Sequence, residues 1–130
     1  MKKLLDTNLL IRFLLNDNPK QAQAIQNLLE TSKEFLVLTD VSFAEIIWVL
    51  TSYYKLPKTQ IVEKLKHILT LTVIEANKPC LFKALANYES HNLDYINAYL
   101  AAYAQGKKIR EIYSYDRDFD KLPSIDRVEP

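Results

Sequence analysis

The sequence predicts an α/β fold in which a central parallel sheet of four to five short strands is flanked by helices. Short apolar runs of the length of buried strands alternate with longer stretches whose apolar residues recur at helical spacing. The chain has one glycine in 130 residues, which favours helices with short connections and argues against a glycine-rich phosphate loop. The length and the lack of repeats or linkers predict a single domain over residues 1–130.

The boundaries of the elements follow from local signals. Pro19, Pro57 and Pro79 stand where helices begin, because proline fits the first helical turn. Asp40 or Ser42 is the expected cap of the third helix, and Gly106 is expected to end the sixth. The predicted strands are 2–5, 35–38, 72–74, 112–114 and 127–129. The predicted helices are 7–15, from 19 past 29, from 40 to about 54, from 57 past 69, from 79 past 88, and from about 93 to 105.

Composition gives the broad class of the protein. Seventeen basic residues oppose sixteen acidic ones, so only local patches can attract nucleic acid. Cys80 is the only cysteine, which excludes an internal disulfide and fits a reducing compartment. No apolar run approaches the roughly 20 residues of a membrane span, and Asp6 and Arg12 interrupt the apolar start of the chain. We therefore expect a cytoplasmic protein without membrane contact.

Two acidic residues directly follow predicted strands. Asp6 comes after the first strand and Asp116 after the strand that ends at Ser114. If these strands are parallel, both carboxylates emerge at the same edge of the sheet, where α/β proteins bind ligands. Taken singly, each is more simply explained as the cap of a helix or turn.

Glu45 is less usual, because Val41, Trp48 and Val49 are its helical neighbours. A carboxylate in an apolar stripe is costly to bury unless it is paired or binds a metal ion. The alternative is a Glu at the margin of the stripe with its head in water. The spacing does not decide between the two.

A second acidic group lies near the end of the chain. Asp94 and Asn97 are one turn apart on the sixth helix and share a face, although Asp94 could equally be a plain charge at the start of that helix. Asp118 and Asp120 alternate with basic residues, as in a solvated turn with Phe119 as its anchor in the core.

Carboxylates gathered at one edge would suit a hard divalent ion such as Mg²⁺ or Mn²⁺. Such an ion can polarise a phosphodiester and lower the pKa of a bound water. His67, His91 and Cys80 are scattered and offer no zinc site, and no serine stands in the setting of a catalytic nucleophile.

Four segments resemble the ordered motifs of the PIN-domain family, and within it the VapC-like toxins. They are LDTNLLIRFL at 5–14, the stretch from Asp40 to Leu50 with Glu45, LDYINAYLAAYA at 93–104 and YSYDRDFDKL at 113–122. The resemblance covers nearly the whole chain. It implies a magnesium-dependent endoribonuclease, with manganese as an alternative ion, that acts on RNA, forms a homodimer and binds a cognate antitoxin.

The resemblance also assigns roles to residues. The catalytic set is Asp6, Glu45, Asp94, Asn97 and Asp116, the metal ligands among them are Asp6, Asp94, Asn97 and Asp116, and Thr7, Ser114 and Asp118 support them. Arg12 and Arg117 each closely follow a motif Asp, so we expect them to contact the RNA backbone.

One position departs from the family pattern. Asn97 stands where the family usually has a metal-binding Asp, and a neutral amide attracts a cation less strongly. Three explanations stay open: the site is weakened, Asp94 substitutes from the adjacent turn, or Asn97 is an inactivating replacement. A catalytically weakened RNA- or protein-binding module is therefore the main alternative. A receiver-type signalling domain fits less well, because no Lys matches the one that such a pocket needs.

Overall fold

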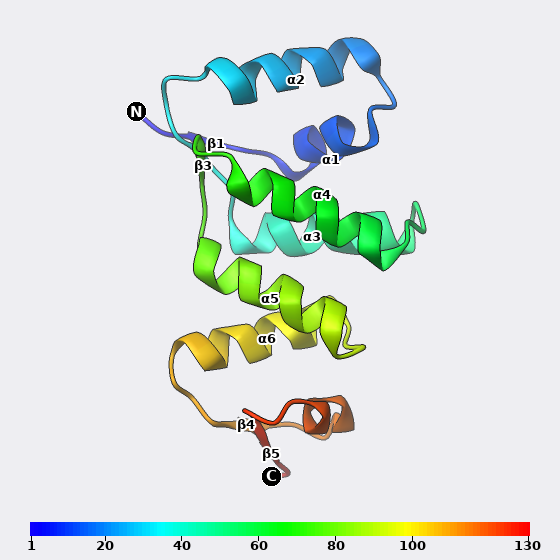
Figure 1. Cartoon of the computed structure of the whole chain (residues 1–130), viewed down its shortest axis with the longest axis vertical. Coiled ribbons are helices and arrows are strands. Elements are labelled where there is room, and N and C mark those ends of the chain that lie inside the picture. The colour runs from blue at the N-terminus through cyan, green and yellow to red at the C-terminus, as the bar shows by residue number, and fades with distance from the viewer. The chain divides into compact units, whose positions relative to one another are not determined.

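A computed structural model describes residues 1–130 of the chain. The chain divides into two compact units, Met1–Lys78 and Pro79–Pro130. Each unit combines helices with parallel strands, so the α/β class and the parallel pairing are confirmed (Figure 1).

The first unit contains a three-stranded parallel sheet. Its strands are β1 (Lys3–Leu4), β2 (Leu36–Val37) and β3 (Ile74–Glu75), paired in the order β1-β2-β3. The ladder continues past β1 and β2, because the backbone N–H of Leu5 donates to Val37 and that of Leu38 donates to Glu75. The residues that follow β1 and β2 therefore emerge at the same edge of this sheet.

Four helices complete the first unit: α1 (Thr7–Leu15), α2 (Pro19–Thr31), α3 (Asp40–Ser52) and α4 (Lys58–Thr70). Helix α1 packs against α2 and α3, and α3 also contacts α4 (Figure 1). Their apolar faces form a core that excludes water almost completely. Its fully buried members include Leu10, Phe43, Ile46, Leu50, Ile61, Leu65 and Ile68. The predicted stripe of α4 is thus confirmed as a buried face.

The start of α3 corrects one prediction. Neither Asp40 nor Ser42 caps the helix: the Oγ1 of Thr39 accepts a hydrogen bond from the backbone N–H of Ser42 at 3.1 Å. Thr39 has the extended backbone that a capping residue needs, whereas Asp40 and Ser42 already lie in the first turn. Asp40 still places a negative charge at the positive end of the helix.

The second unit holds α5 (Lys78–Ser90), α6 (Tyr95–Gly106), the strands β4 (Glu111–Tyr113) and β5 (Asp126–Val128), and the short 3₁₀ helix η1 (Arg117–Lys121). Strands β4 and β5 pair in parallel. The buried Asn87 of α5 donates to the carbonyl of Ala98 and to the side chain of Gln105, which ties α5 to α6. Phe119 is almost fully buried, which confirms it as the anchor of the closing turn.

Several predicted boundaries shift. The three strands of the first unit are shorter than expected, β4 and β5 each begin one residue earlier, and the five strands form one sheet of three and one of two. The predicted strand at 72–74 begins only at Ile74, because the backbone N–H of Ile74 donates to Leu71 and closes a turn first. Gly106 is the last residue of α6 rather than its left-handed cap, and Lys108 takes the positive φ of 58° instead. No helix has the length and apolar character needed to cross a membrane.

Candidate metal centre

Asp94, Asn97 and Asp116 come together within the second unit. Asp94 is the N-cap of α6, and its Oδ1 accepts from the backbone N–H of Asn97 at 2.8 Å. The side-chain Nδ2 of Asn97 donates to Oδ2 of Asp116, also at 2.8 Å. Asn97 and Asp116 are 19 residues apart in sequence, so the sixth-helix motif and the closing motif meet at this point.

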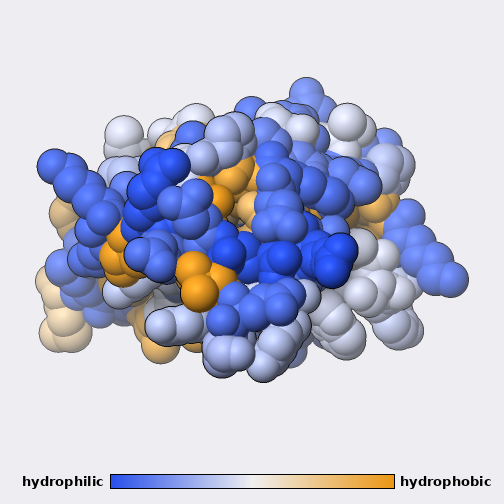
Figure 2. Space-filling view, turned by 90° about the horizontal axis from the view of Figure 1, so that it is seen from below, coloured by the Kyte–Doolittle hydropathy of each residue, from blue (hydrophilic) through white to orange (hydrophobic).

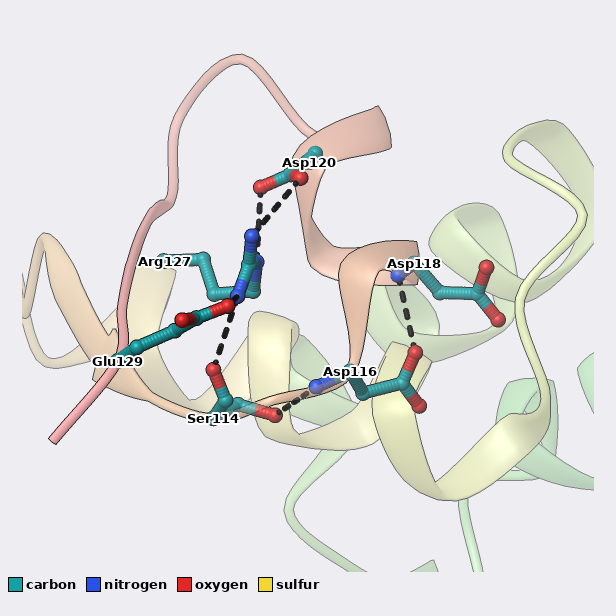
Figure 3. A network of polar contacts seen from close by, with 6 residues as sticks. All are labelled: Ser114, Asp116, Asp118, Asp120, Arg127 and Glu129. Atoms are coloured by element: carbon teal, nitrogen blue, oxygen red, sulfur yellow. Dashed lines mark hydrogen bonds and ion pairs between the residues drawn. The ribbon is translucent and has the colours of Figure 1, made fainter.

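The closing motif folds around Asp116. The backbone N–H of Asp116 donates to the Oγ of Ser114, and Oδ1 of Asp116 accepts from the backbone N–H of Asp118, both at 2.9 Å. Asp116 is thereby the N-cap of η1, as Figure 3 shows. Capping, the simpler role considered for this residue, is thus present, and the same carboxylate also faces Asn97.

These hydrogen bonds stabilise the charged form of Asp116. The backbone N–H of Asp118 lowers the pKa of the Asp116 carboxyl most, followed by the Asn97 amide, while Lys121 and Arg127 add smaller attractions. Asp116 is therefore anionic at neutral pH and has the charge state that a cation ligand needs.

The lowered pKa of Asp116 predicts a pH dependence of stability. A depressed folded-state pKa stabilises the chain fully above the ordinary value of 3.8, and this contribution is lost as pH falls through the folded-state value. In chelator-treated protein, Asp116→Asn should lower Tm at pH 7, and the gap to the unsubstituted chain should shrink below about pH 4. Thermal unfolding monitored by circular dichroism measures both. Asp17→Asn, in the exposed turn between α1 and α2, is the control. A gap that stays constant down to pH 2 would contradict the assigned hydrogen bonds.

In the first unit, Asp6 occupies the N-cap position of α1 but its side chain does not cap the helix. The capping residues Thr39, Asp94 and Asp116 all use their side-chain oxygens for that purpose. Asp6 is exposed and lies two residues after the end of β1, at the edge of the sheet where Thr39 lies two residues after the end of β2. Its carboxylate is thus available to a ligand at this edge. Thr7, the proposed supporting residue, is buried.

Glu45 lies on the exposed face of α3. Its side chain is exposed, and so are its helical neighbours Val41, at 79%, and Trp48, at 66%. The Glu45 carboxylate is therefore not desolvated within the first unit. This agrees with the second interpretation given above, in which the head of Glu45 contacts water. The buried face of α3 is formed by Phe43, Ile46, Ile47 and Leu50.

The family model described as "PIN domain" matches residues 3–125, which is nearly the entire chain. The chain belongs to the PIN domain family. Among solved structures, this PIN domain is similar to a chain of VapBC2 from Rickettsia felis, crystallised with a DNA fragment from its promoter. The identity is 15%, the match covers 99% of this chain and 98% of that chain, and the TM-score is 0.42.

A chain of a toxin–antitoxin complex from Klebsiella pneumoniae is also similar to this PIN domain. The identity is 17%, coverage is 95% of both chains, and the TM-score is 0.34. The search of curated proteins gave no match.

The PIN domain chain offers oxygen donors of the kind that a hard cation prefers. No group of three or more His, Cys, Asp or Glu side chains is placed to hold a metal ion. In the second unit the donors are two carboxylates and one amide, and the amide nitrogen of Asn97 faces Asp116. A carboxylate only accepts hydrogen bonds, so this contact turns the amide oxygen of Asn97 away from Asp116. The donor chemistry fits Mg²⁺, and Asn97 would bind the ion only after its amide rotates.

Some basic residues near the motifs are exposed, and others make hydrogen bonds or ion pairs within the chain. Arg12 and Arg117 are exposed, as an RNA contact requires. Lys121 instead donates to the carbonyl of Asn92 and pairs with Asp118, so it serves the local structure. On the face shown in Figure 2, hydrophilic residues predominate and hydrophobic ones are scattered, so this face presents no large apolar patch.

Arg127 contacts the closing motif and was not among the predicted site residues. The sequence places it only in the predicted strand at 127–129. The guanidinium donates to Asp120, Glu129 and the carbonyl of Ser114. The surplus of nearby acids in the motif is the only sequence signal that points to a basic partner.

Proposed function

We propose that this PIN domain is a magnesium-dependent endoribonuclease and the toxin of a type II toxin–antitoxin module, acting in the cytoplasm. The observation that carries the proposal is the contact between Asn97 and Asp116 beside Asp94, which joins two of the four motifs through polar side chains. The anionic state of Asp116 and the uncapped carboxylate of Asp6 support it further.

The proposed metal ligands are Asp6, Asp94, Asn97 and Asp116. When bound, Mg²⁺ would supply positive charge that polarises the scissile phosphate and acidifies a water molecule. Glu45 would orient the attacking water, for which an exposed carboxylate is suited. The hydroxyl of Thr7 would support Asp6. Asp118 would keep the carboxylate of Asp116 directed through its backbone N–H, which donates to Oδ1 of Asp116. Ser114 would hold the backbone at Asp116, because its Oγ accepts from the Asp116 N–H.

A cleavage assay tests this function directly. The purified chain is incubated with total RNA in Mg²⁺, in Mn²⁺ and in excess chelator, and the ends of the products are mapped. We expect defined cleavage sites with either ion and a loss of cleavage in chelator. Undiminished cleavage in chelator would exclude the metal mechanism, and the absence of cleavage with both ions would favour the binding module described below.

We propose that Arg12 and Arg117 guide the RNA backbone. Both are exposed, and each follows a motif Asp closely in sequence. Phosphate contacts release counterions, so RNA affinity should fall as salt rises. An affinity that does not change between low and high salt would contradict this assignment.

The proposed assembly is a homodimer that binds an antitoxin. Its support is a group of exposed aromatic side chains at α3 and just after it: Trp48, Tyr53 at 76% and Tyr54 at 40% exposure. Aromatic residues are enriched in the cores of interfaces. A monomer in light scattering at micromolar concentration would contradict the dimer.

A catalytically weakened RNA- or protein-binding module is the second candidate. The observation that favours it is Asn97 itself, a neutral amide at the position where the family usually has a metal-binding Asp. A calorimetric titration with Mn²⁺ separates the two candidates. Binding in the micromolar range supports the nuclease, whereas no binding by folded protein supports the module.

A further inference from the structure

Arg127 of β5 makes a dense set of hydrogen bonds in the second unit. Its Nε donates to Oδ1 of Asp120 at 3.1 Å, and its Nη1 donates to the carbonyl of Ser114 at 3.2 Å and to Glu129 at 2.8 Å. Its Nη2 reaches the second oxygen of Asp120 at 3.4 Å. The Arg127 side chain is only 12% exposed, so it is held in place rather than extended into solvent.

Two of these partners, Ser114 and Asp120, stand at the two ends of the segment that carries Asp116. Ser114 lies two residues before Asp116 and Asp120 lies four residues after it, and Figure 3 shows the guanidinium between the two. The guanidinium is a rigid plane with several donors, so it fixes the separation of the groups that it binds. Arg127 therefore spans the Ser114–Asp120 segment from one end to the other.

Inside the Ser114–Asp120 segment, two hydrogen bonds orient Asp116. Ser114 accepts from the backbone N–H of Asp116, and Asp116 accepts from the backbone N–H of Asp118. Arg127 holds Ser114 through its backbone carbonyl, so the path of the chain at Ser114 determines where the hydroxyl stands. A shift of the Ser114 backbone would weaken the first of these bonds.

The fold of the second unit has other supports. Phe119 and Leu122 are buried, and β4 and β5 pair through their backbones. A second arginine, Arg110, directly precedes β4 and pairs at 2.8 Å with Asp126 at the start of β5, whereas Ser114 directly follows the end of β4. Arg110 thus offers a matched comparison: the same residue type makes the same kind of ion pair beside the same two strands, without contact to the Ser114–Asp120 segment.

We infer that Arg127 is a positioning residue: it fixes the conformation of the Ser114–Asp120 segment and so the direction in which Asp116 presents its carboxylate to a divalent cation. The inference that Arg127 affects cation binding rests on the proposed function. The inference that Arg127 fixes the Ser114–Asp120 segment rests on the hydrogen bonds alone.

Hydrogen exchange tests the positioning of the segment without metal or substrate. In Arg127→Met, the amides of Asp116 and Asp118 should exchange at least about fivefold faster, because local opening becomes easier. The amide of Ala98, bonded to Asp94 in α6, should keep its rate. Arg110→Met should leave all three amides unchanged. If Arg127→Met leaves the Asp116 and Asp118 amides at their original rates, the inference is wrong. If Arg127→Met does not fold, Arg127→Lys replaces it, because a single ammonium cannot hold all three partners.

A Mn²⁺ titration tests the consequence for the cation. Arg127→Met should weaken Mn²⁺ binding about tenfold, the effect typical of losing a residue that orients a metal ligand. Cleavage by the variant should recover as Mn²⁺ rises, while Arg110→Met behaves like the original chain. If the Asp116 and Asp118 amides exchange faster in Arg127→Met but its Mn²⁺ affinity is unaltered, Arg127 has no role in cation binding. If the original chain binds no Mn²⁺, the proposed function and that role both fail, and the exchange rates alone decide whether Arg127 orders the segment.

Discussion

Asn97→Asp is expected to tighten Mg²⁺ and Mn²⁺ binding by at least about tenfold and to raise RNA cleavage with it. In the structure the Nδ2 of Asn97 donates to Oδ2 of Asp116 at 2.8 Å. An Asp at position 97 has no proton to donate at neutral pH, so the hydrogen bond is lost and two carboxylates face each other. Like charges this close repel unless a cation lies between them, and a divalent ion removes that repulsion while it binds.

Calorimetry with each ion and a cleavage assay on the same RNA measure the effect of Asn97→Asp. Asn27→Asp on α2 is the control, because it adds the same charge and its side-chain oxygen can still accept from Gln23. In chelator, the repulsion should also raise the pKa of one carboxylate of the new pair, so Asn97→Asp should lose stability when the ion is removed. Equal metal affinity and equal rates before and after the substitution would show that position 97 does not contact the ion.

Asp6→Asn is expected to reduce metal-dependent cleavage roughly 100-fold or more while leaving the fold intact. The carboxylate of Asp6 makes no capping hydrogen bond to α1, so Asp6→Asn removes only the small favourable interaction of its charge with the start of the helix. We expect Tm to change by only about 2–3 °C, as for most exposed substitutions. The loss of activity would then come from the loss of a ligand for the cation.

Cleavage rates, Mn²⁺ affinity and thermal unfolding of Asp6→Asn should be measured together. Asp17→Asn, the exposed acid between α1 and α2, changes the net charge equally and should keep full activity. Full cleavage by Asp6→Asn would remove Asp6 from the proposed site, and a large fall in Tm would mean that its role is structural.

The elements of the fold could be predicted where a sequence pattern has a single interpretation. The first helix lies at residues 7–15 as predicted, since its apolar residues recur at helical spacing directly after a strand. The resemblance to the PIN-domain family put Asn97 and Asp116 in one catalytic set, and within the second unit the Asn97 amide donates to the Asp116 carboxylate. The cap of α3 was not predictable in the same way, because Thr39, Asp40 and Ser42 are all good capping residues.

Other features depend on contacts that a sequence does not display. Helix α3 is apolar almost all round, with Phe43 buried and Val41 and Trp48 exposed, so periodicity could not tell which face carries Glu45. The role of Arg127 depends on the parallel register of β4 and β5, which brings Tyr113 opposite Val128 and so places Arg127 near the end of β4. Nothing in the local sequence around Arg127 indicates that pairing.

Asp6 stands where a helix could be made more stable. A side chain that bonded back to the first turn of α1 would satisfy backbone N–H groups that Asp6 leaves to other partners. Selection of variants for heat resistance alone would therefore not keep a carboxylate at position 6, because the helix does not use it as a cap. Thermostabilised descendants of this chain are then expected to lose Asp6, a proposed ligand of the cation, while they keep the fold.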